Sequence, residues 1–99
     1  MMRKWGYLKK EYYVNKTDIV YKIMIHEMKK CTFVYLYCSK DAVMCSYDYC
    51  YPNLENALED WDCEVDLEGW HMIDDPALNC PRDYIESTRM KGSVKDNLQ

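Results

Sequence analysis

The alternation of hydrophobic and polar positions predicts β-strands in the first half of the chain. Residues 19–26 have Ile or Tyr at every odd position, and the even positions include Lys22 and His26. This alternation and the β-branched content are the pattern of a half-buried strand. Residues 5–14 are rich in Tyr, and the polar segment 15–18 that follows them has the composition of a turn. We therefore expect the chain to begin with two strands joined by a tight turn.

Residues 18–30 also permit a helical interpretation. Thr17 is suited to cap a helix whose polar side would carry Asp18, Lys22 and His26. The lysines at positions 29 and 30 would lie at its C-terminal end, where cations interact favourably with the helix dipole. The period of two favours the strand, and the helix is kept as its alternative.

A second hairpin is predicted between residues 32–38 and 42–50, which are both rich in Val, Tyr and Cys. If Lys40 and Asp41 form a two-residue loop, cross-strand pairing sorts the side chains into two faces. The first face is expected to be core and carries Val34, Leu36, Cys38, Val43, Cys45, Tyr47, Tyr49 and Tyr51. The second face is expected to be half exposed and carries Phe33, Tyr35, Tyr37, Ala42, Met44, Ser46, Asp48 and Cys50.

The clearest element is an amphipathic helix after Pro52. Asn53 is a favourable N-cap, and Gly69 stands where a helix is commonly terminated. The apolar positions between them recur with helical spacing and form one stripe that can be buried. These positions are Leu54, Ala57, Leu58, Trp61 and Val65.

Two further strands are expected after the helix, at residues 70–73 and, as an edge strand, at residues 83–90. Residues 92–99 are polar and are expected to form a frayed tail, so that residues 1–91 make up a single domain. The predicted fold is α+β. It consists of a mostly antiparallel sheet of about four to six strands in the order β-β-β-β-α-β, with one amphipathic helix packed on one face.

Charge is distributed unevenly along the sequence. The 99 residues carry a net charge of −4, yet residues 1–40 contain nine Lys or Arg and three acidic residues, whereas residues 55–75 contain nine carboxylates and neither Lys nor Arg. The first residues lack the apolar run of a signal peptide, and no stretch approaches the ~20 apolar residues of a membrane span. We therefore expect a cytoplasmic protein without a membrane partner.

The chain contains six cysteines, and their spacing includes no C-x2-C pair of the kind that binds structural zinc. In a cytoplasmic protein, free thiols behave as small, mostly buried residues. We expect these thiols to be reduced and the protein to use no cofactor.

Four of the carboxylates fall on one side of the predicted helix, opposite Trp61. These are Glu55, Glu59, Asp62 and Asp66. Like charges three or four residues apart cost a helix roughly 0.2–0.5 kcal/mol per pair, so the three successive pairs together cost about 1 kcal/mol. A local cost without a local gain indicates either a functional role or a long-range compensation.

Two interpretations of this acidic stripe remain open. It is either a solvated helix face that keeps the protein soluble, or a docking surface for a basic macromolecule. The docking interpretation predicts a non-enzymatic inhibitor, either a toxin antidote or a phage or mobile-element inhibitor of the anti-CRISPR type that imitates nucleic-acid phosphates. Its partner would be a basic protein surface, such as that of a nuclease, rather than nucleic acid itself, and self-association stays open.

The candidate contact residues combine the stripe with the acidic turn that follows and with the Tyr-rich sheet face. Tyr is a favoured anchor in protein interfaces because its ring is apolar and its tip is polar. The rings would lose this role if they packed against the C-terminal segment, which is an equally open alternative. The candidates are Glu55, Glu59, Asp62, Asp66, Asp74, Asp75, Tyr35 and Tyr37.

Catalytic and metal-binding interpretations have weaker support. His71 with one of the thiols would make a small thiol- or histidine-dependent enzyme, but the chain has no nucleophile elbow and no recognisable third residue to orient a base. His26 has apolar neighbours and is expected to be structural. The acidic residues around His71 form neither a calcium loop nor the paired-histidine helix of a zinc site. We expect neither catalytic residues nor a bound metal.

A sheet-based RNA-binding module is the remaining alternative. Lysines of the N-terminal half, together with Tyr12, Tyr35 and Tyr37, could form a sheet on which bases stack. The pI of the sequence is about 5.1, however, whereas nucleic-acid-binding domains are usually strongly basic. Protein binding is therefore the preferred expectation.

Overall fold

A computed structural model of the chain describes residues 2–76 and 79–86. These residues form a five-stranded sheet with one short α-helix, in the order β-β-β-β-α-β, so the expected α+β class and element order are confirmed. The elements are β1 (Arg3–Val14), β2 (Asp18–Glu27), β3 (Thr32–Tyr37), β4 (Tyr47–Tyr51), α1 (Leu54–Trp61), the 3-10 helix η1 (Asp62–Glu64) and β5 (His71–Ile73).

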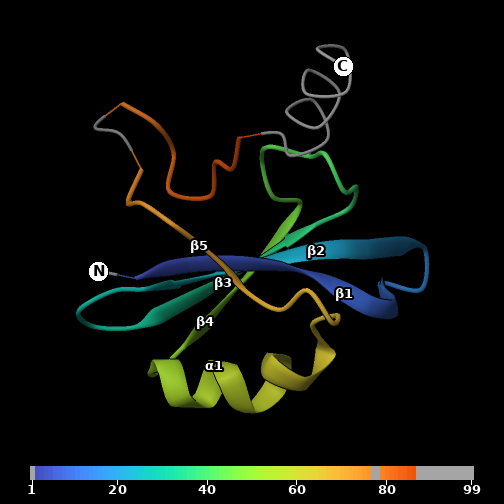
Figure 1. Ribbon diagram of the computed structural model, residues 1–99, viewed down its shortest axis with the longest axis horizontal. Helices are drawn as coiled ribbons and strands as arrows, with labels where there is room; N and C mark the ends of the chain where they lie inside the picture. The colour runs from blue at the N-terminus through green and yellow to red at the C-terminus, as the bar shows by residue number, and fades with distance from the viewer. Residues whose placement is uncertain (1, 77–78, 87–99) are drawn as a thin grey trace.

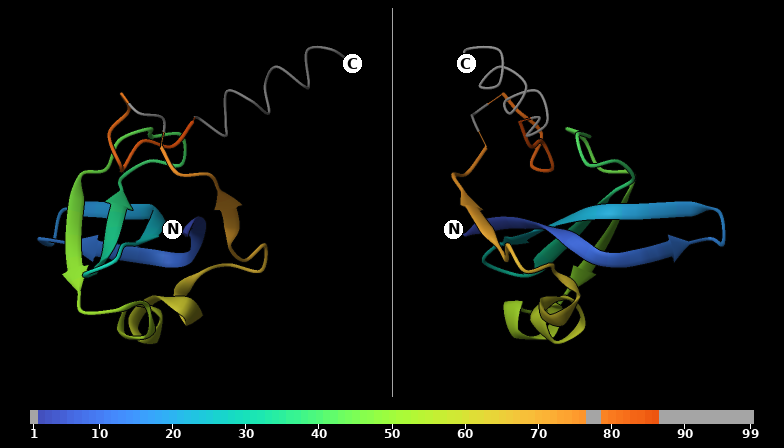
Figure 2. Two further views of the ribbon diagram at one scale, coloured as in Figure 1. Left: turned by 90° about the vertical axis from the view of Figure 1, so that its left-hand side faces the viewer. Right: turned by 45° about the vertical axis from the view of Figure 1, so that its right-hand side comes forward.

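The sheet has the strand order β4-β3-β2-β1-β5, and every neighbouring pair is antiparallel. Because β4 and β5 lie at opposite edges, the chain between them has to cross one face of the sheet. Helix α1 lies on that face, whereas the segment after β5 lies on the other face, as Figure 1 and both views of Figure 2 show. The described residues therefore form a helix layer, a sheet and an irregular covering layer.

The first hairpin forms where the sequence predicts it. Residues 18–27 are the strand β2, so the strand interpretation of this segment is confirmed and the helical alternative is wrong. Asn15 and Lys16 both have positive φ angles, of 56° and 69°, and the Thr17 amide donates to the Val14 carbonyl at 3.3 Å. Two consecutive left-handed residues match the twist of the flanking strands.

The register of the second hairpin differs from the expected one. Strand β4 begins at Tyr47 rather than at residue 42, and its pairs include Val34 with Tyr49 and Leu36 with Tyr47. The two-residue loop is replaced by a long connection over residues 38–46. The register is displaced by two residues, and since side chains alternate with a period of two, the strand residues keep their expected faces. Cys45 does not, because it precedes β4 and packs with Tyr35 and Tyr37 on the second face. Tyr49 is exposed, contrary to its expected place in the core.

Helix α1 is shorter than the sequence pattern indicates. It starts as predicted, but it ends at Trp61 instead of continuing through Val65. Val65 is extended and forms a β-bridge with Leu8, and the Asp66 amide donates to the Tyr7 carbonyl at 2.8 Å. The expected helix stop, Gly69, has a φ of 76° but closes a turn after this bridge.

Apolar side chains gather on both faces of the sheet. The cluster under α1 consists of Val20, Ile23, Ile25, Val34, Leu36, Ala57, Trp61 and Val65, and the cluster on the opposite face consists of Trp5, Met24, Tyr35, Tyr37 and Ile85. The expected half-exposed second face is confirmed in part. Tyr35 and Tyr37 are buried, because residues 38–46 and 79–86 help to cover this face. Met44, Ser46, Asp48 and Cys50 are exposed. In the described ranges, no helix has the length and apolar character that a bilayer span requires.

The expected edge strand at residues 83–90 is only partly within the described chain. Residues 83–86 are not in a strand. Residues 87–90 and the expected tail at 92–99 lie outside the described residues. The segment is instead held by irregular contacts, one of which is the hydrogen bond that the Ile85 amide donates to the Val43 carbonyl at 2.9 Å.

Candidate functional site

The orientation of α1 is fixed by its cap and its inner side. The Asn53 side chain accepts a hydrogen bond from the Asn56 amide at 2.8 Å, as expected for the N-cap. On the inner side, the Trp61 indole donates to the Tyr51 hydroxyl at 2.9 Å, and this hydroxyl donates to Asp60 at 2.8 Å. Burial and the Asp60 carboxylate raise the pKa of Tyr51 to about 12. These contacts leave the opposite side of the helix in solvent.

The solvent side of α1 and η1 carries three exposed carboxylates, which we call the acidic helix face: Glu55, Glu59 and Asp62. Among the residues that the structure describes, no Lys or Arg side chain forms an ion pair with any of the three. Asp62 accepts a hydrogen bond from the Trp70 indole at 2.8 Å, which orients the carboxylate without neutralising it. The acidic helix face is thus an ordered anionic surface that forms no ion pair with the Lys and Arg residues of the described chain.

Asp66 does not belong to this face, contrary to the stripe of four predicted from the sequence. The helix has ended before Asp66, and the Asp66 side chain accepts from the Glu68 amide at 3.0 Å within the turn that Gly69 closes. Its backbone pairs with β1. Asp66 therefore has a structural role in the connection between η1 and β5.

Tyr35 and Tyr37 are absent from the surface. Tyr35 is 6% exposed and Tyr37 is fully buried. The Tyr37 hydroxyl donates a hydrogen bond to the Asp83 carbonyl. Burial raises the pKa of both hydroxyls. The alternative in which the rings pack against the C-terminal segment is therefore correct, and neither an exposed Tyr contact surface nor an RNA-stacking platform exists at these two positions.

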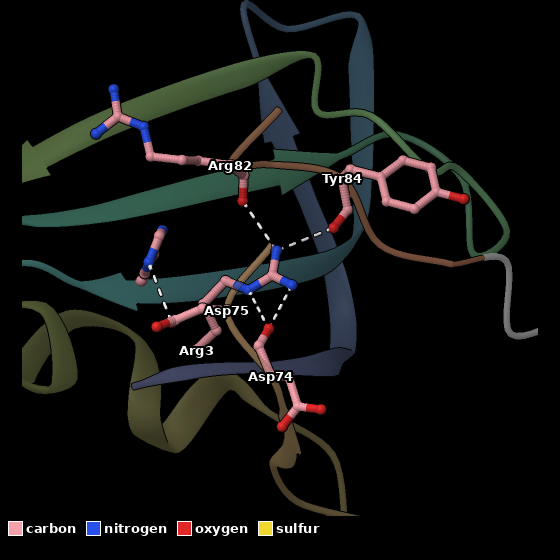
Figure 3. Close-up of polar contacts among 6 residues, drawn as sticks. Arg3, Asp74, Asp75, Arg82 and Tyr84 are labelled. Carbon is pink, nitrogen blue, oxygen red and sulfur yellow. Dashed lines mark hydrogen bonds and ion pairs between the residues drawn. The ribbon is translucent and has the colours of Figure 1, made fainter. Parts of the chain in front are cut away.

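Asp74 lies on the other side of the sheet from α1, at a cluster organised by Arg3 (Figure 3). The Arg3 guanidinium donates through Nε and Nη2 to the Asp74 carbonyl at 2.8 and 2.5 Å, and through Nη1 to the carbonyls of Arg82 and Tyr84, both at 3.0 Å. Arg3 is itself buried. It holds the covering segment against the sheet, a role that its position in a basic N-terminal half did not reveal.

Asp75 faces His26 in the same cluster. The His26 Nε2 atom is 3.9 Å from Asp75 Oδ1, whereas His26 Nδ1 has no hydrogen-bond partner among the described residues. Burial lowers the pKa of His26, and Arg3 lowers it further against the opposing effect of Asp75. A buried imidazole with a lowered pKa fits the structural role expected for His26.

A pocket of about 510 Å³ lies beside this cluster, and its wall includes Arg3, Trp5, Asp75, Tyr84 and Ile85. The wall combines carboxylates with aromatic rings. The guanidinium group in the wall is that of Arg3, and it donates its hydrogen bonds to backbone carbonyl oxygens. Asp74 and Asp75 therefore belong to a site separate from the acidic helix face. The structure brings together only Glu55, Glu59 and Asp62 of the residues predicted to make one docking surface.

His71 and the six cysteines are the remaining side chains that the sequence offers for catalysis or metal binding. His71 stacks on Trp5 with ring centroids 4.3 Å apart, and its Nε2 lies 3.2 Å from Glu68 Oε1. All six cysteines are free, and burial together with Asp83 raises the pKa of Cys45 to about 12. Within the described ranges, no group of three or more potential ligands could hold a metal ion.

Comparison with known proteins adds no assignment. No protein-family model matches the chain, and neither the curated proteins nor the solved structures include a significant match.

Proposed function

We propose that this protein is a non-enzymatic binding protein that docks on a basic macromolecular surface through the acidic helix face. The observation that carries the proposal is the exposure of Glu55, Glu59 and Asp62 side by side on α1 and η1, with no ion pair to a Lys or Arg among the residues that the structure describes. Tyr35, Tyr37 and Asp66, which have structural roles, are not part of the proposed surface, and Asp74 and Asp75 lie elsewhere.

Energetics support a role beyond stability. The last turn of α1 has no basic residue, although the helix dipole favours cations there. Asp60 and Asp62 stand at this end instead, and the like-charge spacing from Glu55 to Glu59 costs a few tenths of a kcal/mol. A cationic partner would convert these unfavourable terms into favourable ones on binding.

The spacing of the carboxylates favours a partner that normally binds nucleic acid. Side chains one helical turn apart are separated by about 6 Å, so the face offers a row of negative charges on a rigid support. Such a row can engage a surface lined by Lys and Arg and can accelerate encounter by long-range attraction. We infer an inhibitor of a nuclease or another nucleic-acid-binding protein, in the manner of a toxin antidote or a mobile-element inhibitor.

A charge-matched pair of variants tests the proposal. The first variant combines Glu55→Gln, Glu59→Gln and Asp62→Asn. The control combines Glu11→Gln, Asp48→Asn and Glu86→Gln, which remove three exposed carboxylates elsewhere. Binding to a panel of cationic nucleases, and inhibition of their cleavage, would be measured by interferometry and gel assay at about 50 and about 300 mM NaCl.

The first variant is expected to bind at least about tenfold more weakly than the wild type, while the control binds normally. High salt should weaken the wild type much more than the first variant. Equal losses in both variants would show that only net charge matters and that the acidic helix face is a solvated surface. Wild-type affinity in the first variant would overturn the proposal.

A further inference from the structure

Two cysteines meet at the edge of the sheet formed by β3 and β4. Cys50 lies in β4 opposite Phe33, and Cys31 directly precedes β3, two residues before Phe33. Side chains two residues apart on a strand point to the same face, so Cys31 is the diagonal cross-strand neighbour of Cys50. Diagonal neighbours in an antiparallel pair lie roughly 7–8 Å apart, and their Cβ atoms are somewhat closer.

The two thiols influence each other and can be reached from solvent. A hydrogen bond with the Cys31 side chain is the largest of the effects that raise the pKa of Cys50. Cys50 is exposed and Cys31 is half-buried. Cys45 differs from both, because burial and Asp83 keep its thiol protonated.

We propose that Cys31 and Cys50 form a reversible intramolecular disulfide by exchange with a low-molecular-weight disulfide. The thiolate of Cys31 attacks one sulfur of the small disulfide, which releases one small thiolate and leaves a mixed disulfide on Cys31. The thiolate of Cys50 then attacks the Cys31 sulfur and displaces the second small thiolate. The protein loses two electrons and two protons, and the small disulfide is reduced to two thiols.

The bond would fasten the edge of the sheet that leads into α1. Among the described residues, strand β4 has a hydrogen-bonded neighbour on one side only, namely β3. A link from Cys31 to Cys50 closes a loop over residues 31–50 and so reduces the freedom of the unfolded chain. It also holds β4 in place just before Asn53, the cap of α1. Oxidation would therefore stabilise the part of the fold that supports the helix.

The test uses the full chain, reduced and then incubated with oxidised glutathione at about pH 8, where a useful fraction of free thiols is ionised. After alkylation, peptide mass spectrometry identifies the linked cysteines. The native wild type should form the Cys31–Cys50 link at least about tenfold faster than the protein in urea, because the folded state holds the thiols together. Cys50→Ser should abolish the link, and Cys63→Ser, at another exposed thiol, should leave it unchanged.

Thermal unfolding gives a second measurement. The linked wild type should melt roughly 10 °C higher than the reduced protein, whereas Cys31→Ser and Cys50→Ser should show no such shift under oxidising conditions. A native protein that accumulates only glutathione adducts, or that forms the link only in urea, would overturn the proposal. An unchanged melting temperature in the linked protein would contradict the stabilising role of the bond.

Discussion

At the scale of single residues, two basic side chains act inside the fold rather than on its surface. Lys22 is fully buried, and its ammonium group donates to the carbonyls of Lys40 at 3.1 Å and Ala42 at 2.7 Å. The same group lies 5.1 Å from the centre of the Tyr37 ring. Like Arg3, Lys22 uses carbonyl oxygens to hold an irregular segment, which compensates in part for the cost of burying a cation.

Lys22 predicts a pH dependence of stability. Burial lowers its pKa from 10.5 to about 8, so between these values the unfolded chain binds a proton that the folded protein has released. Stability therefore rises with pH across this window, and the penalty for burying the cation is complete below its lower end. Between about pH 7 and about pH 9.5, the wild type should gain about 2 kcal/mol relative to Lys22→Met.

Urea denaturation of both proteins across this range measures the difference. The comparison with Lys22→Met removes the titration of Tyr and Cys residues, whose raised pKa values oppose the gain at high pH. A difference between the two proteins that does not vary with pH would show that Lys22 keeps an ordinary pKa in the folded state.

At the scale of elements, the end of α1 is set by a strand rather than by the helix itself. Val65 continues the apolar period of the helix, but its pairing with Leu8 draws the chain into an extended conformation. The connection then passes very close to Gly6. A Cβ atom on Gly6 would lie 2.7 Å from Val65 Cγ1 and 3.2 Å from the Gly69 carbonyl oxygen.

This close approach predicts a coupled pair of substitutions. Gly6→Ala should lower the free energy of unfolding by roughly 1–3 kcal/mol, because Val65 is branched and tightly packed and cannot easily move away. Val65→Ala removes the obstructing methyl groups. The loss in free energy of unfolding in the double variant should therefore be smaller than the sum of the two single losses by at least about 0.5 kcal/mol. Strict additivity in denaturant titrations would contradict the proposed contact.

At the scale of the whole molecule, the second face of the sheet depends on segments that have no regular structure. Ile85 is 3% exposed and belongs to the cluster that contains Trp5, Met24 and Tyr37. The covering segment also contacts residues 38–46, since Asp83 accepts a hydrogen bond from the Cys45 amide at 3.0 Å. Loss of this covering segment would expose the rings of Tyr35 and Tyr37, which pack in the same cluster as Ile85.

Ile85→Ala tests the contribution of the cover. The substitution should cost about 2–4 kcal/mol of stability, the usual range for an Ile-to-Ala change in a core. It should also raise the reactivity of Cys45 toward a thiol reagent, because burial contributes most to the raised pKa of that thiol. Glu86→Ala, at an exposed neighbouring position, should change neither quantity. Wild-type stability of Ile85→Ala would mean that the cover does not seal the second face.

The sequence by itself determined the features that depend on neighbouring residues. The turn at Asn15 and Lys16, the Asn53 cap and the sorting of β3 side chains into two faces all follow from local conformational preference and from periodicity. These interactions involve residues only a few positions apart. They are therefore visible in the order of amino acids, and the α+β class with its element order followed from them.

Only the tertiary structure decided which surfaces exist. The end of α1 depends on Leu8, which is distant in sequence from Val65, and the burial of Tyr37 depends on Asp83 and Ile85. The same long-range packing separates Asp74 and Asp75 from the acidic helix face. Periodicity shows that a face is apolar or acidic, but it does not show which remote segment covers that face. The covering segment is selected by contacts between parts of the chain that are far apart in sequence, and a local pattern does not relate such parts.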